Sequence, residues 1–166
     1  MTVLLITLAI IFNAILQSTL IPYIGVFGVI PNTAIVIIVL IALRKGRVYG
    51  SAFGIFAGLL QDIFFSQIIG INGFILFFIG YLVGFAHDAF TRETAINPFI
   101  FTAVGTIFYN FLFSLFQFFL SRDIIFIDAV KSIFSLEVFY NGIIAVILFK
   151  LIQRIFIQPN LRFGRR

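Results

Sequence analysis

No Asp, Glu, Lys or Arg precedes Arg44, so the chain opens with a long uncharged stretch. Over all 166 residues, 62% are hydrophobic and only 10% are charged. A soluble domain of this size cannot bury so many apolar side chains, because small folds expose much of what they carry. Apolar runs of roughly 18 or more residues with few charges are typical of membrane-spanning helices. The sequence therefore predicts an all-α integral membrane protein.

Six spans can be drawn from the apolar runs and the Pro- and Gly-containing breaks between them. The N-terminal run lacks the basic region and the cleavage site of a secretory signal, so we expect it to be retained as the first helix. Residues 124–134 are interpreted as a short helix lying at the interface, and their role is left open. We expect one transmembrane domain over residues 1–166, with spans at about 3–20, 32–43, 47–64, 72–89, 99–120 and 136–157.

The orientation is predicted from the basic residues, which concentrate in cytoplasmic loops. If six helices alternate, nine basic residues fall on one side of the membrane and only Arg122 and Lys131 on the other. This asymmetry predicts that both termini are cytoplasmic. The net charge of +5 is then a topology signal and an attraction to the lipid bilayer, and we expect no nucleic-acid partner. The nine are Arg44, Lys45, Arg47, Arg92, Lys150, Arg154, Arg162, Arg165 and Arg166.

The third expected span carries a glycine at every fourth position. Gly50, Gly54 and Gly58 lie within about 80° of one helix face. Small residues at this spacing allow two helix backbones to approach closely in lipid. Gly80 and Gly84 form a matching pair in the next span. We therefore expect these five glycines to pack the two helices together.

Polar side chains inside the spans gather in the outer half of the membrane under this orientation. Asn13 and Gln17 in the first span, and Glu137 and Asn141 in the last, are spaced at i,i+4 and so share one helix face. Two interpretations remain open. These residues form inter-helical hydrogen bonds that fix packing, or they line an outward polar cleft or a surface that binds the helix of another membrane protein.

Asp62 closes the third expected span at its outer end. A carboxylate at a helix C-terminus meets the negative end of the helix dipole, and its burial near lipid is unfavourable. We therefore expect Asp62 to have a partner, either in another protein or within this chain. The internal candidates are Asn32, Asn72, Arg122 and Lys131.

No enzyme signature is present in the sequence. There is no cysteine, no recognisable catalytic motif and no ligand set at metal-binding spacing. The one histidine, His87, stands beside Asp88 and is interpreted as a solvated polar residue. We therefore expect no catalytic residues, no metal and no cofactor, which leaves binding or scaffolding.

Several weak motifs occur in one order along the chain. "IPN" at Ile30, Pro31 and Asn32 precedes "LRKGRVYG", the glycine-rich helix that ends in "GLLQD", then "GINGF" and "GYLVG". This ordered set resembles the MreD family of rod shape-determining membrane proteins. The resemblance runs from Met1 to about Lys150. One departure is Asn32, where the family often carries an acidic residue.

The resemblance implies a non-enzymatic scaffold of the rod, or elongation, complex in the bacterial plasma membrane. It would support cell shape and lateral peptidoglycan synthesis by binding a bitopic MreC-like protein. Through that protein it would be linked to the actin-like MreB and, indirectly, to RodA and a penicillin-binding protein. The family is also thought to share the fold of the substrate-binding subunits of ECF transporters, the S-components.

Under this resemblance, Pro31, Asn32 and Asp62 shape the outer end of a cleft or the contact with MreC, while the glycines close the bundle. An alternative function is a solute-binding membrane subunit of an ECF-type transporter, which would use the same outer polar cleft as a substrate pocket. Tyr109 and Tyr140 are the aromatic side chains that favour this alternative. Homo-oligomerisation is left open by the sequence.

Overall fold

A computed structural model describes residues 2–25, 29–89, 96–120 and 136–156. The described chain is helical, apart from the turns between helices and an isolated bridge residue. Its elements are α1 (Thr2–Thr19), the 3-10 helix η1 (Ile21–Ile24), α2 (Thr33–Lys45), α3 (Arg47–Phe65), α4 (Ile71–Gly84), α5 (Ala86–Ala89), α6 (Ile96–Phe119) and α8 (Leu136–Phe156).

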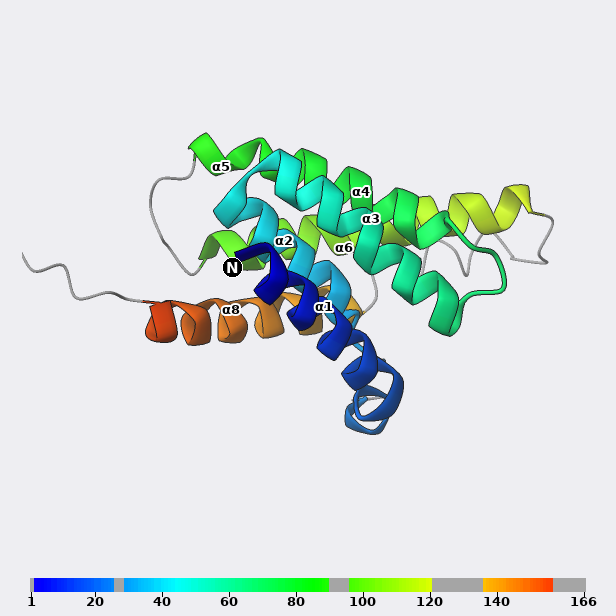
Figure 1. Cartoon of the computed structure of the whole chain (residues 1–166). Coiled ribbons are helices and arrows are strands. Elements are labelled where there is room, and N and C mark those ends of the chain that lie inside the picture. The colour runs from blue at the N-terminus through cyan, green and yellow to red at the C-terminus, as the bar shows by residue number, and fades with distance from the viewer. Residues whose placement is uncertain (1, 26–28, 90–95, 121–135, 157–166) are drawn as a thin grey trace, which may run out of the picture.

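The six longer helices run in alternating directions through the bundle (Figure 1). Three of them contain stretches long and apolar enough to cross a membrane: Arg47–Phe65, Ile96–Phe119 and Leu136–Arg154. Val3–Thr19 and Ile71–Gly84 are shorter apolar helices. The structure thus supports a helical membrane protein with three long candidate spans.

Two helix boundaries differ from the sequence-based expectation. The helix expected over residues 72–89 is divided, because α4 ends at Gly84 and the short α5 begins at Ala86. The Phe85 N–H bonds the carbonyl oxygens of Leu82 and Val83 at this point, in place of the i−4 pattern of an α-helix. The expected helix 99–120 begins earlier, at Ile96, and Pro98 fits its first turn because no intrahelical donor is needed there.

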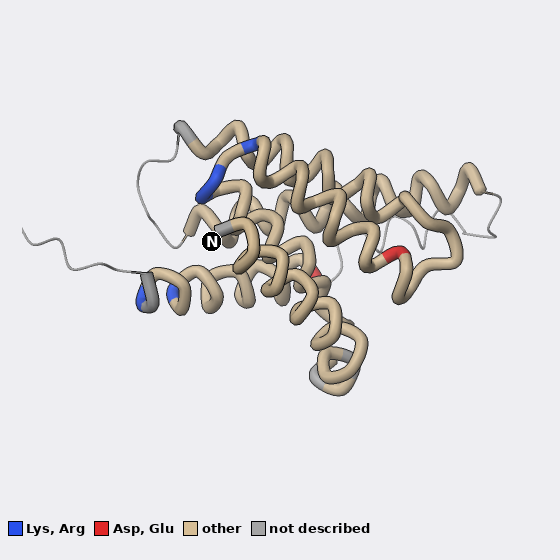
Figure 2. Tube along the Cα trace, in the orientation of Figure 1, with Lys and Arg blue, Asp and Glu red and all other residues tan. Residues whose placement is uncertain are grey.

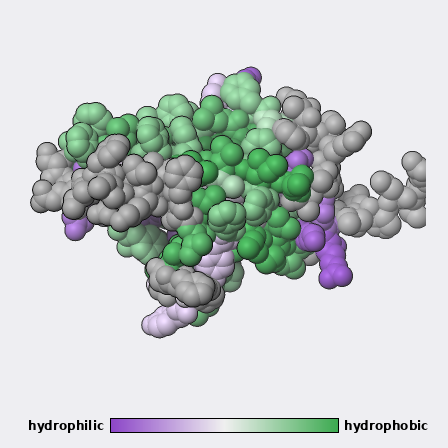
Figure 3. All heavy atoms as spheres, turned by 180° about the vertical axis from the view of Figure 1, so that it is seen from behind, coloured by the Kyte–Doolittle hydropathy of each residue, from purple (hydrophilic) through white to green (hydrophobic). Residues whose placement is uncertain are grey.

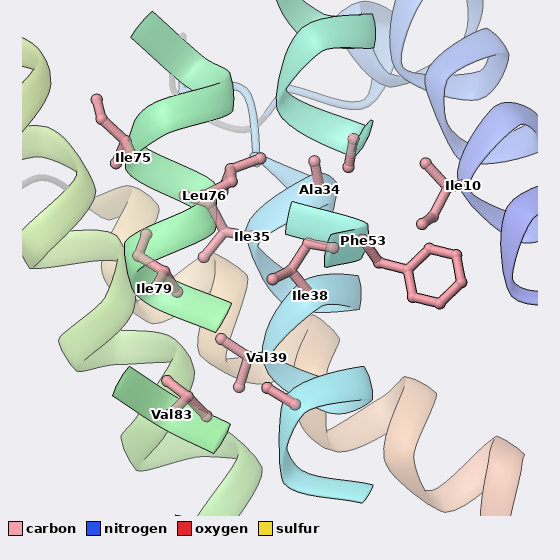
Figure 4. Packing of buried hydrophobic residues seen from close by; sticks show 12 residues of the cluster. Ile10, Ala34, Ile35, Ile38, Val39, Phe53, Ile75, Leu76, Ile79 and Val83 are labelled. Atoms are coloured by element: carbon pink, nitrogen blue, oxygen red, sulfur yellow. The ribbon is translucent and has the colours of Figure 1, made fainter. Parts of the chain in front are cut away.

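The core of the bundle is built around α2. Eight of its 13 residues are buried, and Ile35, Val36, Ile38 and Val39 are fully inaccessible. Side chains of α2 meet those of α4 in the main apolar cluster, together with Ile10 of α1 and other neighbours (Figure 4). A helix of 13 residues rises about 20 Å, less than the ~30 Å hydrocarbon core of a bilayer. α2 is therefore an interior element shielded by the longer helices.

The outer surface of the bundle is strongly apolar. Side chains such as Leu4, Ile63, Phe118 and Phe139 are more than half exposed, and apolar residues cover the middle of the face seen in Figure 3. Exposed apolar surface of this extent marks contact with lipid or another protein. This pattern agrees with a bundle whose surrounding solvent is lipid.

Candidate functional site: a polar network between the helix ends

The described Lys and Arg residues lie at one end of the bundle, and the two carboxylates with described side chains, Asp62 and Glu137, lie away from that end (Figure 2). Around these two carboxylates, polar side chains from six helices are linked by hydrogen bonds. We call this set the polar network. Its members are Gln17, Asn32, Thr33, Gln61, Asp62, Asn72, Thr106, Tyr109, Asn110, Glu137 and Asn141.

Asn32 stands at the centre of the polar network. It is the N-cap of α2, where its Oδ1 accepts a long 3.5 Å bond from the Ile35 N–H. The same oxygen accepts a 2.9 Å bond from Gln61 Nε2 of α3. Its backbone N–H donates to Asn141 Oδ1 of α8 at 3.0 Å. The residue before it, Pro31, is buried. The side chain and the backbone N–H of Asn32 therefore join the start of α2 to two other helices.

α1 is joined to the polar network by Gln17. Its Oε1 accepts bonds of 3.3 Å from both Thr33 Oγ1 and Gln61 Nε2. Asn13, one turn earlier, is buried on the same helix. Because Gln61 Nε2 faces two acceptor oxygens, the orientation of its amide is fixed. Its own Oε1 is buried and has no donor among the described residues.

Asn141 connects α8 to α6. Its Nδ2 donates to Thr106 Oγ1 of α6 at 3.2 Å and to Glu137 Oε1 at 3.3 Å. The other carboxylate oxygen of Glu137 accepts from Asn110 Nδ2 at 3.4 Å. Asn141 is fully buried, whereas Glu137 is half-buried in the first turn of α8. A carboxylate is favourable at that helix end.

Asp62 is fully buried, and its carboxylate is directed to the start of α4. Oδ2 accepts from the backbone N–H groups of Gly70 and Gly73 at 2.9 and 3.2 Å. Oδ1 accepts from the backbone N and the Nδ2 of Asn72 at 3.2 and 2.9 Å. The unfavourable dipole of its own helix is thus offset by the favourable N-terminus of α4. Of the expected partners, Asn72 binds Asp62, and Arg122 and Lys131 lie outside the described residues.

Tyr109 of α6 closes the polar network. Its hydroxyl donates to Asn72 Oδ1, and the side chain of Asn32 lies near this hydroxyl. The sequence had suggested Tyr109 only as a support for solute binding. The sequence does not single out Gln61, Thr33 or Thr106 as members of this site. Isolated polar residues on separate helices give no signal of which helices will meet.

α3 and α4 make the closest helix contact in the bundle, and glycines line it. A Cβ added to Gly54 would lie 2.3 Å from the Leu76 carbonyl oxygen, and one on Gly58 would lie 2.4 Å from that of Asn72. Gly50 and Gly80 face each other: a Cβ added to Gly50 would lie 2.5 Å from the Gly80 carbonyl oxygen, and one on Gly80 would lie 2.1 Å from that of Gly50. Gly84 approaches the backbone of Arg47 in the same way. These distances leave no room for a side chain.

Two surface depressions accompany these helices. One, of about 240 Å³, is an apolar hollow against α3 and α4, lined by Ile55, Leu59, Gly70, Gly73, Phe74 and Phe77. The other, of about 180 Å³, lies beside the α3–α4 connection and includes Ser66, Gln67 and Gln117. Both are smaller than the roughly 300–1,000 Å³ of usual small-molecule sites.

The chemistry of the polar network is hydrogen bonding between amides, hydroxyls and two carboxylates. Among the described residues, no group of three or more His, Cys, Asp or Glu could hold a metal ion. His87 is not a member of the polar network, and its Nδ1 lies 2.7 Å from the Leu43 carbonyl oxygen near the end of α2. The arrangement is suited to holding helices together and to presenting polar groups.

Comparison with known proteins gives one family. A family model described as rod shape-determining protein MreD matches residues 1–158, essentially the whole chain. No curated protein and no solved structure matches the chain.

Proposed function

The chain belongs to the rod shape-determining MreD family, and from this premise we propose that it is a non-enzymatic membrane scaffold of the elongation complex. Membership implies a role in rod shape determination. In our proposal, that role is to bind the transmembrane helix of an MreC-like bitopic protein. The link to MreB, and indirectly to RodA, a penicillin-binding protein and peptidoglycan synthesis, then runs through this partner.

We propose that the six longer helices cross the plasma membrane, with the short α2 held inside the bundle by its neighbours and both termini in the cytoplasm. The support is the distribution of charge. The described Lys and Arg residues lie at one end of helices that alternate in direction, and the carboxylates of the polar network lie away from that end (Figure 2). The basic end would face the cytoplasm by the positive-inside rule.

The observation that carries the scaffold proposal is the convergence of six helices on the polar network. Within it, burial divides the members into two roles. Asp62, Asn141 and Gln61 are buried and would position the helix ends. Gln17, Asn32 and Glu137 are only partly buried and would contact the partner. A polar group of the partner helix would gain a hydrogen bond there that lipid cannot offer.

Glu137 offers the sharpest test. Glu137→Gln keeps the size of the side chain and removes its charge, so we expect the chain to fold and insert, and to co-purify with less of a co-expressed MreC-like protein. A loss of about tenfold or more is the expected size, because one hydrogen bond to a charged group is worth roughly 1.5–3 kcal/mol. Gln67→Ala, an exposed residue of the α3–α4 connection outside the polar network, is the matched control.

Equal recovery of the partner with Glu137→Gln and with the unchanged chain would remove Glu137 from the contact. The solute-binding alternative gains no support from the two depressions, because both are smaller than usual ligand sites.

A further inference from the structure

The two carboxylates of the polar network differ in how far the chain itself satisfies them. Asp62 is fully buried and accepts four hydrogen bonds from the start of α4, three of them from backbone N–H groups. Glu137 is half-buried and accepts one bond on each oxygen, from Asn110 Nδ2 at 3.4 Å and from Asn141 Nδ2 at 3.3 Å. Both are longer than the roughly 2.7–3.2 Å that is usual for N–H···O bonds. Glu137 therefore keeps an unused capacity to accept hydrogen bonds, whereas Asp62 does not.

The negative charge of Glu137 has no counter-charge among the described residues. Both of its hydrogen-bond donors are neutral amides, and no described Lys, Arg or His forms an ion pair with it. The described Lys and Arg residues lie at the basic end of the bundle, away from Glu137 (Figure 2). A carboxylate near lipid is costly unless it is paired with an opposite charge. A cation from outside the described part of the chain would therefore stabilise it.

Two amides of the polar network already use both hydrogens of their NH₂ groups. Asn141 Nδ2 donates one hydrogen to Glu137 and one to Thr106. Gln61 Nε2 likewise faces two acceptors, and Gln61 Oε1 is buried with no donor among the described residues. These amides have no further donor to offer, so a group that binds here must bring N–H hydrogens of its own.

Glu137 lies where a second helix can reach it. The neighbouring Leu136 and Phe139 are 58% and 63% exposed, so the surface around the carboxylate is apolar. Glu137 stands in the first turn of α8, at the opposite end of this helix from Lys150 and Arg154. A transmembrane helix packed at this place would cover the two apolar side chains. A Lys or Arg near the end of that helix would extend its long side chain to the carboxylate.

A free metal ion fits this place less well. Divalent cations are held by several oxygen ligands, usually with more than one carboxylate, and the described residues contain no group of three or more His, Cys, Asp or Glu that could hold one. An ammonium or guanidinium group supplies N–H donors, and a guanidinium can bond both oxygens of one carboxylate. A single carboxylate with spare acceptor capacity is therefore suited to a Lys or Arg side chain.

We propose that Glu137 binds a Lys or Arg side chain at the outer end of the partner's transmembrane helix. Glu137 supplies the charge, and Asn110 and Asn141 hold its carboxylate in place. Leu136 and Phe139 pack against apolar side chains of the same partner helix. This inference rests on the proposed function, because it names the group of the MreC-like partner that the site recognises.

The test is a charge exchange between the full chain and a co-expressed MreC-like partner, measured as the amount of partner that co-purifies. Each Lys or Arg that flanks the outer end of the partner's transmembrane segment is replaced by Glu in turn. Glu137→Lys is expected to lower the recovery of the unchanged partner about tenfold or more, because two cations then meet at the contact. Combined with the matching Lys→Glu or Arg→Glu change in the partner, it should restore recovery to within about threefold of the unchanged pair.

Gln67→Lys is the matched control, because Gln67 is exposed in the α3–α4 connection and lies outside the polar network. It should change the recovery less than about twofold. If Glu137→Lys disturbs the fold, Glu137→Gln keeps the proposal testable. Its loss should not add to that of a Lys→Gln or Arg→Gln change in the contacting partner residue, because either change alone already breaks the pair.

Unchanged recovery with Glu137→Lys would overturn the inference and leave the scaffold proposal standing. So would a loss that no charge reversal in the partner restores, which would indicate a neutral hydrogen bond. An equal, non-additive loss with Arg122→Gln or Lys131→Gln, both outside the described residues, would place the cation within this chain instead. If the unchanged chain recovers no partner at all, the proposed function itself fails, and this inference fails with it.

Discussion

The carboxylate of Asp62 accepts two hydrogen bonds from Asn72, one from its backbone N–H at 3.2 Å and one from its Nδ2 at 2.9 Å. Together with the N–H groups of Gly70 and Gly73, these bonds make Asp62 the cap of the helix that follows its own. The connection between α3 and α4 is thereby held in place by a buried carboxylate that accepts four hydrogen bonds.

Asp62→Asn is expected to destabilise the chain strongly. One carboxylate oxygen would be replaced by an N–H donor facing the donors at the start of α4, so buried N–H groups would be left without an acceptor. The expected loss is about 3 kcal/mol of unfolding free energy, measured by denaturation in mixed detergent micelles. Ser66→Ala removes only the bond to Asn72 Nδ2 and should cost about 1 kcal/mol. Equal stability of the two variants would contradict this account of Asp62.

Gly54→Ala is expected to push α3 and α4 apart. The new methyl group would overlap the backbone carbonyl of Leu76, which cannot move without shifting α4. Overpacking of this kind costs about 1–3 kcal/mol, measured in the same denaturation assay. Gly105→Ala is the control, because a Cβ there meets only side-chain methyl groups at 3.4 Å or more. If Gly54→Ala were as well tolerated as Gly105→Ala, the close contact would not be required.

Tyr109→Phe should weaken the link between α6 and α4 within the polar network. Loss of the hydroxyl leaves Asn72 Oδ1 without its donor and removes the contact with Asn32. A decrease of about 1 kcal/mol in unfolding free energy is expected. Tyr81→Phe, at an exposed position on α4, should have no measurable effect. A similar result for both tyrosines would place the Tyr109 hydroxyl outside the energetics of the fold.

The orientation can be tested with single cysteines, because the chain has none of its own. Tyr23→Cys, at an 89% exposed position in η1, should react with a membrane-impermeant maleimide in intact spheroplasts. Lys45→Cys, in the turn between α2 and α3, should react only after the membrane is permeabilised. The reverse pattern would place the basic end outside and overturn the proposed orientation.

The sequence by itself determined the class of the protein and much of its local structure. Uncharged apolar runs require a nonpolar environment, and i,i+4 spacing places Glu137 and Asn141, or Gly50, Gly54 and Gly58, on one helix face whatever the rest of the chain does. Such properties depend on near neighbours in the chain. They are therefore accessible without the fold.

Only the tertiary structure decided which of these faces meet. Asp62 binds Asn72, Asn32 bonds Gln61 and Asn141, and Tyr109 bonds Asn72. The helix expected over residues 72–89 also breaks at Phe85. A hydrogen bond between helices depends on their packing angle and register, which are set jointly by all the helices of the bundle. The spacing of residues within one helix cannot specify them.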